Sequence, residues 1–242
     1  MFHPGGPTFF ELARQALSST ERGYDLLAAK FDLTPFRTAD PLIASAVAIL
    51  GEVDNALDIC CGTGAGILGL RARCRRQLVG VDFSAGMLAE ARRRTANAPG
   101  DAPIQLVRAD ARHLPFAGTF SLAVCFGALG HFVGADQDLL VTSIARALRP
   151  GGRFAFISRT RPSILSVRFW LECGFDAAMR VRNALLRPPF VMCYLNFLLP
   201  EAAELLVRHG FSVEVKKLSG TLLLVIGTLN RVHDGDQLGQ KR

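Results

Sequence analysis

A glycine-rich turn directly after a short apolar run is the part of this sequence with the clearest chemistry. Residues 56–60 are apolar except for Asp58, which is typical of a buried strand, and Gly62 and Gly64 follow at once. Glycines let the chain turn sharply and bring backbone N–H groups close to a ligand. Because a helical pattern resumes at 65–76, the turn predicts a site for negative charge or for hydroxyl and carboxylate oxygens.

The elements around this turn alternate between strands and helices. Five apolar or alternating segments predict strands, at 56–60, 77–82, 104–110, 120–127 and 153–158. Helical patterns separate them, so we expect an α/β fold with a doubly wound parallel sheet. Two more strands, at 211–215 and 221–227, are joined by a short turn and must be antiparallel.

The chain is expected to form one domain, since no repeat or independent linker interrupts it. Its expected parts are a helical cap (1–40), a core (41–160), a helical insertion (161–199), a helix and strand pair (200–230) and a tail (231–242).

Local signals place several boundaries. Ser18 and Glu21 form a candidate capping box, and Asp40 and Asp136 are expected to cap the helices that follow them. Gly174 is a position where the insertion helix could divide in two, and residues 149–152 predict a turn.

The composition excludes several classes. None of the apolar runs among the 242 residues reaches the roughly 18 that a membrane span needs. The first residues lack the order of a secretory signal. Six cysteines form no Cys-x-x-Cys motif, which favours reduced thiols in the cytoplasm over disulfides, and no metal site is expected.

A net charge of +7 allows an anionic partner such as nucleic acid or a membrane surface. Many of the arginines fall near predicted helix ends, where cations complement the helix dipole (Arg71, Arg73, Arg75, Arg76, Arg92, Arg93 and Arg94). One Trp and two Tyr leave little aromatic material for base stacking. Nucleic acid is therefore not the expected partner.

Four motifs in order carry a family resemblance: LDICCGTG at 57–64, VGVDFSAGML at 79–88, RADARHLPF at 108–116 and LRPGG at 148–152. Over residues 40–160, and more loosely 200–230, the sequence resembles the class I S-adenosylmethionine-dependent methyltransferases. It looks closest to the small-molecule branch that includes quinone-biosynthesis enzymes. The resemblance implies a Rossmann-like sheet, S-adenosylmethionine as cofactor, and transfer of its methyl group to a small, hydrophobic or aromatic acceptor.

The resemblance also assigns roles. Asp82 would accept the ribose hydroxyls, Phe83 would lie against the adenine, and Asp110 would accept from the adenine amino group. Asp58 would hold the loop and face the amino group of the methionine part. The full set of expected cofactor contacts is Asp58, Gly62, Thr63, Gly64, Asp82, Phe83, Met87, Asp110, Ala111 and Cys125.

The sequence departs from the family pattern at two positions. Cys60 stands where glycine is usual, and Ser121 stands where a Phe-Asp pair usually opens the fourth strand. A side chain at Cys60 narrows the approach to the ligand. Cys125 has apolar neighbours that raise a thiol pKa, so we expect packing or a cofactor wall rather than a nucleophile.

The implied reaction is an in-line displacement at a sulfonium methyl, for which the protein mainly supplies alignment and a dry site. His131, after the fourth strand, is the candidate base if the nucleophile must lose a proton. It could equally orient a loop or be a satisfied structural group. Tyr24 could close over the cofactor or simply pack within the cap.

The insertion at 161–199 is where this family carries acceptor-binding segments. One helical stripe is apolar and the opposite face carries charges at i,i+4 spacing. Eight of its side chains could line an acceptor site or pack on the sheet: Phe169, Trp170, Phe175, Met179, Phe190, Met192, Tyr194 and Phe197. A basic amphipathic helix could also contact an anionic membrane surface.

Three other function classes are compatible with the sequence. Gly64, Gly66 and Gly69 match a dinucleotide fingerprint of NAD-dependent oxidoreductases, but they begin four residues beyond the strand, and the antiparallel pair is foreign to that fold. The second class is a non-catalytic S-adenosylmethionine-binding protein, and the third is an RNA methyltransferase. The acceptor atom and the oligomeric state cannot be derived from the sequence.

Overall fold

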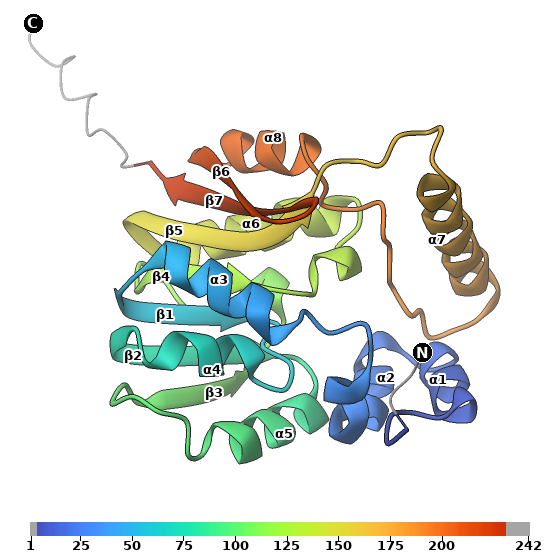
Figure 1. The fold of residues 1–242 in the computed structure, drawn as a ribbon, viewed down its shortest axis with the longest axis horizontal. Coiled ribbons are helices and arrows are strands. Elements are labelled where there is room, and N and C mark those ends of the chain that lie inside the picture. Colours follow the sequence, from blue (N-terminus) through green and yellow to red (C-terminus); the bar gives the residue numbers. More distant parts are fainter. Residues whose placement is uncertain (1–3, 231–242) are drawn as a thin grey trace, which may run out of the picture.

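The computed structural model describes residues 4–230, which fold around a seven-stranded sheet with helices on both faces (Figure 1). The strand order is β3-β2-β1-β4-β5-β7-β6. The strands are β1 (Val53–Ile59), β2 (Cys74–Asp82), β3 (Ile104–Arg108), β4 (Phe120–Cys125), β5 (Leu148–Arg159), β6 (Phe211–Ser219) and β7 (Leu222–Leu229).

Strands β1 to β5 pair in parallel, and β7 pairs antiparallel with both β5 and β6. The expected doubly wound sheet with an antiparallel pair at its end is confirmed. The chain crosses from β3 to the far side of β1 to form β4, so the strand order reverses between β1 and β4. Open α/β sheets bind ligands at such a reversal, beyond the carboxyl ends of the strands.

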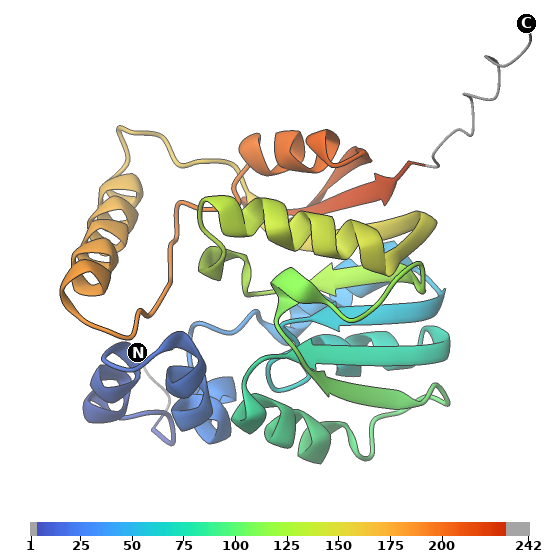
Figure 2. The ribbon, with the colours of Figure 1, turned by 180° about the vertical axis from the view of Figure 1, so that it is seen from behind.

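The two faces of the sheet have separate hydrophobic cores. One face is covered by α3 (Asp40–Leu50), α4 (Ala65–Arg71) and α5 (Ala85–Thr95), and the other by α6 (Ala135–Ala147) and α8 (Glu201–Arg208) (Figures 1 and 2). Alternate residues of a strand serve alternate cores: Leu57 packs toward α6, whereas Ala56 packs toward α3 and α4. Burial on both faces explains why these strands read as nearly continuous apolar runs.

The remaining helices lie beyond the carboxyl ends of the parallel strands. They are α1 (Phe9–Ala16), α2 (Thr20–Leu27) and the 3-10 helix η1 (Ala28–Leu33), which together form the cap, and the insertion helix α7 (Val167–Leu185). Both ribbon views place α1 and α2 near one end of α7 (Figures 1 and 2). Two further 3-10 turns, η2 (Ala111–His113) and η3 (Leu129–His131), follow β3 and β4.

The capping box of the cap lies elsewhere than the sequence predicts. It joins Thr8 and Glu11 at the start of α1. Ser19, rather than Ser18, accepts from a backbone N–H of α2. The capping-box prediction for Ser18 and Glu21 was therefore wrong, by one residue for the serine.

Two aspartates that were expected to cap helices pair with arginines instead. Asp40 is the first residue of α3 and contacts Arg37, and no side chain caps that helix. Asp136 lies within the first turn of α6 and pairs with Arg112, while Gly134 occupies the cap position. A charged partner is a stronger attraction for a carboxylate than one backbone N–H.

Three other boundaries differ from the expectations. Gly174 lies inside the single helix α7, where its Cβ side faces open space. Residues 149–152 belong to β5 rather than to a turn, and an irregular pairing between Phe120 and Leu122 absorbs them. Helix α4 ends at Arg71, so Arg71 and the cluster at 92–94 lie in the last turns of helices, whereas Arg73, Arg75 and Arg76 lie beyond α4.

The tail from 231 to 242 lies outside the described residues. None of the helices within residues 4–230 combines the length and apolarity that crossing a bilayer requires.

Candidate active site

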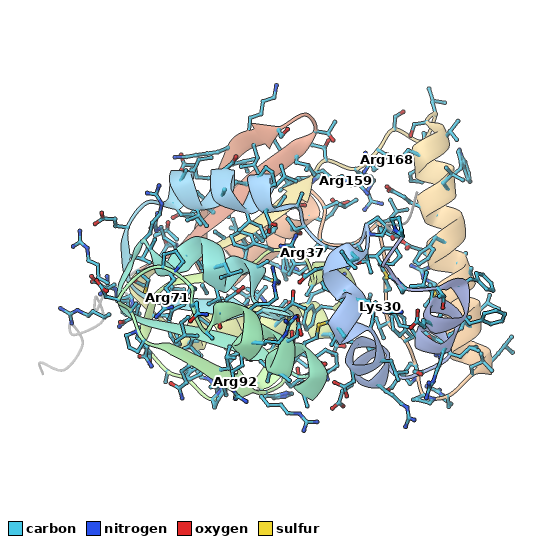
Figure 3. All side chains as sticks on the ribbon, turned by 60° about the horizontal axis from the view of Figure 1, so that its bottom comes forward. Lys30, Arg37, Arg71, Arg92, Arg159 and Arg168 are labelled. Carbon is cyan, nitrogen blue, oxygen red and sulfur yellow. The ribbon has the colours of Figure 1, made fainter. Side chains whose placement is uncertain are left out.

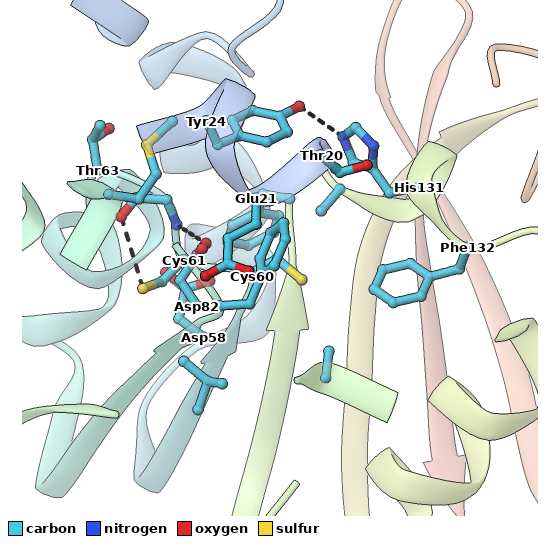
Figure 4. Close-up of a pocket in the computed structure, with 18 of the residues that line it drawn as sticks. Thr20, Glu21, Tyr24, Asp58, Cys60, Cys61, Thr63, Asp82, His131 and Phe132 are labelled. Atoms are coloured by element: carbon cyan, nitrogen blue, oxygen red, sulfur yellow. Dashed lines mark hydrogen bonds between the residues drawn. The ribbon is translucent and has the colours of Figure 1, made fainter. Parts of the chain in front are cut away.

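A cavity of about 760 Å³ lies where the carboxyl ends of β1, β2, β3 and β4 meet the cap (Figure 4). Most of the expected site residues line it, namely Asp58, Gly62, Thr63, Asp82, Phe83, Met87, Asp110, Ala111 and His131. Cap residues complete the wall, among them Tyr24, Phe31 and Arg37. The cavity therefore joins the predicted cofactor end of the sheet to a segment that precedes the first strand.

The glycine turn leaves room where a ligand can approach. Gly62 has a φ of +53°, and a Cβ built there would meet nothing within 4 Å. Gly66 is needed for the opposite reason, since a Cβ there would lie 2.4 Å from Oδ2 of Asp58. The turn is thus shaped by one glycine that opens the cavity and one that admits a buried carboxylate.

Cys60 adopts a backbone conformation that suits glycine. Its φ is +53°, in the left-handed region where a side chain costs about 1 kcal/mol or more. This explains the glycine that the family pattern has there. The Cys60 thiol contacts Cys125 and is buried, and both effects raise its pKa well above the usual value.

Asp58 is a buried carboxyl group with unused hydrogen-bonding capacity. It is 2% exposed, and within the described part of the chain its Oδ2 has no hydrogen-bond partner. Burial raises the pKa of Asp58 to about 8, and the nearby negative charge of Asp82 adds to the shift, while a backbone N–H from Ile67 opposes it. A buried acceptor of this kind favours a ligand that brings a cationic donor.

Asp82 lies at the end of β2 and fixes the glycine turn. Its Oδ2 accepts from the Gly62 N–H and its Oδ1 accepts from the Ser84 N–H, each at 2.9 Å. Burial raises the pKa of Asp82 to about 6 against the opposing effect of these N–H groups. Ser84 itself caps α5 by accepting from the Met87 N–H at 3.1 Å, so Asp82 is free to face the cavity.

Asp110 is held by an arginine two residues further on. Arg112 donates to both carboxylate oxygens of Asp110, and its other end pairs with Asp136. The Arg112 guanidinium overcomes partial burial and holds the pKa of Asp110 below its usual value. Asp110 is therefore an ionised acceptor on the cavity wall.

His131 and Tyr24 form a hydrogen-bonded pair on the other side of the cavity (Figure 4). The Tyr24 hydroxyl lies 2.7 Å from Nε2 of His131, and Nδ1 of His131 contacts the Val191 carbonyl oxygen. Because a carbonyl only accepts, Nδ1 carries the proton and Nε2 accepts from Tyr24. Burial lowers the pKa of His131, so the imidazole is neutral near pH 7, and burial raises the pKa of Tyr24.

Comparison with known proteins agrees with this arrangement. A family model described as a methyltransferase domain matches residues 56–152. A demethylmenaquinone methyltransferase of Symbiobacterium thermophilum is 30% identical over 198 residues, which cover 74% of this chain and 77% of that protein. The chain belongs to the S-adenosylmethionine-dependent methyltransferases.

Other relatives match the methyltransferase over shorter spans. A 2-phytyl-1,4-naphtoquinone methyltransferase of Thermosynechococcus vestitus is 36% identical over 111 residues, 45% of this chain and 47% of that one. Among solved structures, the N-methyltransferase NodS from Bradyrhizobium japonicum in complex with S-adenosyl-L-homocysteine superposes with a TM-score of 0.62 at 18% identity, covering 88% of this chain and 100% of that one. At that identity the likeness concerns the fold.

The cavity of the methyltransferase fits S-adenosylmethionine on chemical grounds. The cofactor carries an α-ammonium group, and Asp58 presents a buried oxygen without a partner among the described residues. It carries two ribose hydroxyls, and Asp82 is a carboxylate at the strand end. The open space beside Gly62 leaves room for the methionine part, and the volume of about 760 Å³ admits a nucleoside with an acceptor beside it.

Two residues that were expected to contact the cofactor do not line the cavity. Gly64 begins α4 with a φ of +87°, and a Cβ there would approach Thr95, so its role is in the turn. Cys125 is fully buried behind Cys60, and the next residue along, Phe126, lines the cavity in its place.

The expected acceptor lining from the insertion is not observed. Of residues 161–199, all of which are described, only Pro189 and Val191 line the cavity. The eight aromatic and methionine side chains expected there lie elsewhere, and Trp170 is 64% exposed. The other expectation for this segment, packing on the sheet, is confirmed for Phe197, which packs edge-to-face on Phe156 of β5. It is wrong for the apolar stripe of α7, because most of that stripe faces solvent.

Sequence reasoning missed the residues that fasten the cap to the cofactor end. Asp32 accepts from the Thr63 hydroxyl at 2.7 Å and pairs with Arg94 and Arg37 at 2.8 and 3.0 Å. Asp25 accepts from the Ser84 hydroxyl at 2.6 Å. These contacts join residues far apart in sequence, so no local pattern could have identified them.

Proposed function

We propose that this methyltransferase transfers a methyl group to a small hydrophobic or aromatic acceptor, of the quinone kind that its relatives are named for. The observation that carries the proposal is the composition of the cavity wall away from the aspartates. Apart from Phe83, which adjoins Asp82, four phenylalanines line the cavity: Phe31, Phe36, Phe126 and Phe132. A cavity wall with this many aromatic rings favours an apolar, planar ligand over a sugar or a charged metabolite.

The donor end is polar and the acceptor end is apolar. S-adenosylmethionine supplies an already activated methyl group, so the protein need not activate a leaving group. Asp58 would hold the ammonium group, Asp82 the ribose hydroxyls, and Asp110 with Ala111 the adenine edge. The cap is fastened through Asp32 and would exclude water from the region where the two ligands meet.

The Tyr24–His131 pair supplies a base where the acceptor carries an acidic hydroxyl. Tyr24 donates to Nε2 of His131, and its oxygen keeps a lone pair. As the acceptor hydroxyl gives its proton to the Tyr24 oxygen, the Tyr24 proton passes to Nε2 of His131. Tyr24 stays neutral throughout, which suits its raised pKa, and the acceptor oxygen becomes the electron-rich centre that attacks or activates its ring.

The unpaired state of all six cysteines supports a reducing, cytoplasmic setting. The rival classes make different use of the same cavity. A non-catalytic binder would hold the cofactor without turnover, an oxidoreductase would bind NADH, and an RNA methyltransferase would lose RNA affinity steeply with salt.

The test is transfer of a labelled methyl group from S-adenosylmethionine into lysate extracts, separated into lipid-soluble and polar fractions. We expect label in the lipid-soluble fraction and none with Asp82→Ala, which should lose cofactor binding while remaining folded. Asp54→Ala, on β1 but outside this cavity, is the matched control and should keep full transfer. Label confined to the polar fraction, or cofactor binding without any transfer, would overturn the proposed acceptor class.

A further inference from the structure

The insertion helix α7 presents its apolar side to solvent. Four large apolar side chains at helical spacing are strongly exposed: Val167 (76%), Leu171 (70%), Val181 (58%) and Leu185 (77%), with Trp170 (64%) beside them. In a helix that packs on its own domain, such residues face inward. Helix α7 therefore presents its apolar side to solvent rather than to the body of the protein.

The inward side of α7 is held by polar contacts instead. Glu172 pairs with Arg159 at 2.6 Å, and both side chains are nearly buried. Asp176, which is 5% exposed, accepts from the Tyr194 and Leu195 N–H groups at 2.7 and 3.0 Å. These contacts fix the orientation of the helix, so the exposure of its apolar side is a consequence of specific interactions.

The charge around this side is positive. Residues 161–199 contain five arginines and two acidic residues, and both acids, Glu172 and Asp176, lie on the inward side. Arg168 pairs with Glu172 at 2.9 Å, and Figure 3 shows it beside α7, whereas Arg180 and Arg187 are exposed and form no ion pair within the described residues. An exposed apolar stripe that includes tryptophan, on a segment with exposed and unpaired arginines, is the composition of helices that lie in the headgroup region of a bilayer.

Helix α1 lies at the same end of the molecule as α7 and adds exposed apolar side chains there. Its Phe9 and Phe10 are 78% and 82% exposed. Arg182 of α7 donates to the Ser18 carbonyl just after α1 at 3.0 Å, and the ribbon views place the two helices at one end (Figures 1 and 2). We define the docking face as the exposed apolar residues of α7, with α1 adjoining it.

We propose that the docking face binds the surface of an anionic lipid bilayer. Exposed apolar side chains would enter the headgroup boundary, and Arg180 and Arg187 would pair with lipid phosphates. A second copy of this chain is disfavoured, because a symmetric contact would bring together two copies of a segment with five arginines and two acidic residues. The length of α7, 19 residues or about 28 Å, suits a helix lying flat in the interface.

The docking face also leads to the cavity. Pro189 and Val191 follow α7 directly, and both line the cavity. A bilayer on the docking face would bring a lipid-soluble acceptor next to the segment that borders the active site. This route rests on the proposed function, whereas binding to the bilayer does not.

The test is co-sedimentation of the full chain with vesicles of phosphatidylcholine alone or with 30% phosphatidylglycerol. We expect binding to the anionic vesicles at least tenfold stronger than to the neutral ones. The double variant Leu171→Asp, Leu185→Asp should bind the anionic vesicles at least tenfold more weakly than the parent does. Val207→Asp, an equally exposed apolar position (59%) on α8, is the matched control and should bind like the parent.

S-adenosylmethionine binding by calorimetry should be the same in all three proteins, which separates failure of the docking face from failure of the methyl-transfer proposal. Absence of binding to anionic vesicles, or equal binding by the double variant, would overturn the inference. The inference would also be overturned if sedimentation velocity showed a dimer of the parent and a monomer of the double variant, because the stripe would then be covered by a second copy.

Discussion

Replacing Asp58 with asparagine removes a carboxyl group that the fold keeps away from water. The side chain is 2% exposed, and burial raises the pKa of Asp58 from 3.8 to about 8. The unfolded chain therefore releases this proton near pH 4, whereas the folded chain without ligand keeps it until near pH 8. Between these values the free energy of unfolding falls as pH rises, because the folded state binds one more proton.

The size of the effect follows from the two pKa values. They differ by about four pH units, and each unit corresponds to about 1.4 kcal/mol, so the full shift corresponds to about 6 kcal/mol. About 5 kcal/mol of this loss in the free energy of unfolding falls between pH 4 and pH 8, since both titrations are partial at those limits. Asparagine carries no charge at any of these pH values. We expect Asp58→Asn to match the parent near pH 4 and to exceed its stability by up to about 5 kcal/mol at pH 8.

The assay is urea unfolding of the ligand-free chain at intervals between pH 4 and pH 8.5. Asp54→Asn is the control, since Asp54 lies on the same strand with 37% of its side chain exposed and should follow the parent curve. Parallel curves for the parent and Asp58→Asn would refute the reasoning, because Asp58 would then be ionised in the fold without cost.

Cofactor binding supplies an independent check on the same group. An ammonium group beside Asp58 favours the carboxylate, so binding at pH 7 should release about 0.9 proton per site from a group whose pKa is about 8. Calorimetry in two buffers of different ionisation enthalpy measures that number. Asp58→Asn should release none and bind the cofactor at least tenfold more weakly.

Four other substitutions, and the pH dependence of the parent, have expected outcomes. Tyr24→Phe keeps the ring packing but removes the donor to its histidine partner; kcat should fall about 100-fold or more, with cofactor affinity unchanged in calorimetry. In the parent, activity should persist below pH 6.5, because burial lowers the pKa of that histidine and keeps it in the basic form. Asp32→Asn should destabilise the chain by about 1–2 kcal/mol and speed amide exchange in residues 20–33, whereas unchanged exchange would mean that the ion pairs do not hold the cap. Gly66→Ala should cost about 1–3 kcal/mol in thermal unfolding, because its Cβ meets the Asp58 carboxylate; Gly174→Ala, with open space at its Cβ, should instead be neutral or stabilising.

The donor half of the site was predictable because its signals are local. Asp58 lies in the last residues of its apolar run, and Asp82 and Asp110 come at the ends of theirs, and parallel strands bring their carboxyl ends to one edge of the sheet. The glycines between β1 and α4 are likewise explained by a turn that no other residue adopts easily. The periodicity of apolar residues and the residue preferences of turns both act within a few residues, so they can be recognised in the sequence.

The other half depends on pairings between distant segments. Tyr24 and His131 are 107 residues apart in the sequence, and the residues next to either one do not indicate that the two side chains pair. The periodicity of α7 predicted an apolar stripe correctly, but a stripe does not say which side faces the body. That depends on Glu172 and Asp176, whose partners lie on other segments.

His131 shows why the segments outside the matched methyltransferase domain decide what this enzyme can do. The family model spans residues 56–152, which include His131, yet both groups that orient its ring lie outside that span. Tyr24 of the cap holds Nε2, and the Val191 carbonyl after α7 fixes the proton on Nδ1. A change in either flank would alter the tautomer or the direction of the imidazole without touching the cofactor site. We therefore expect the shared domain to supply the methyl donor's binding groups, and the cap and insertion together to set the proton chemistry available to the acceptor.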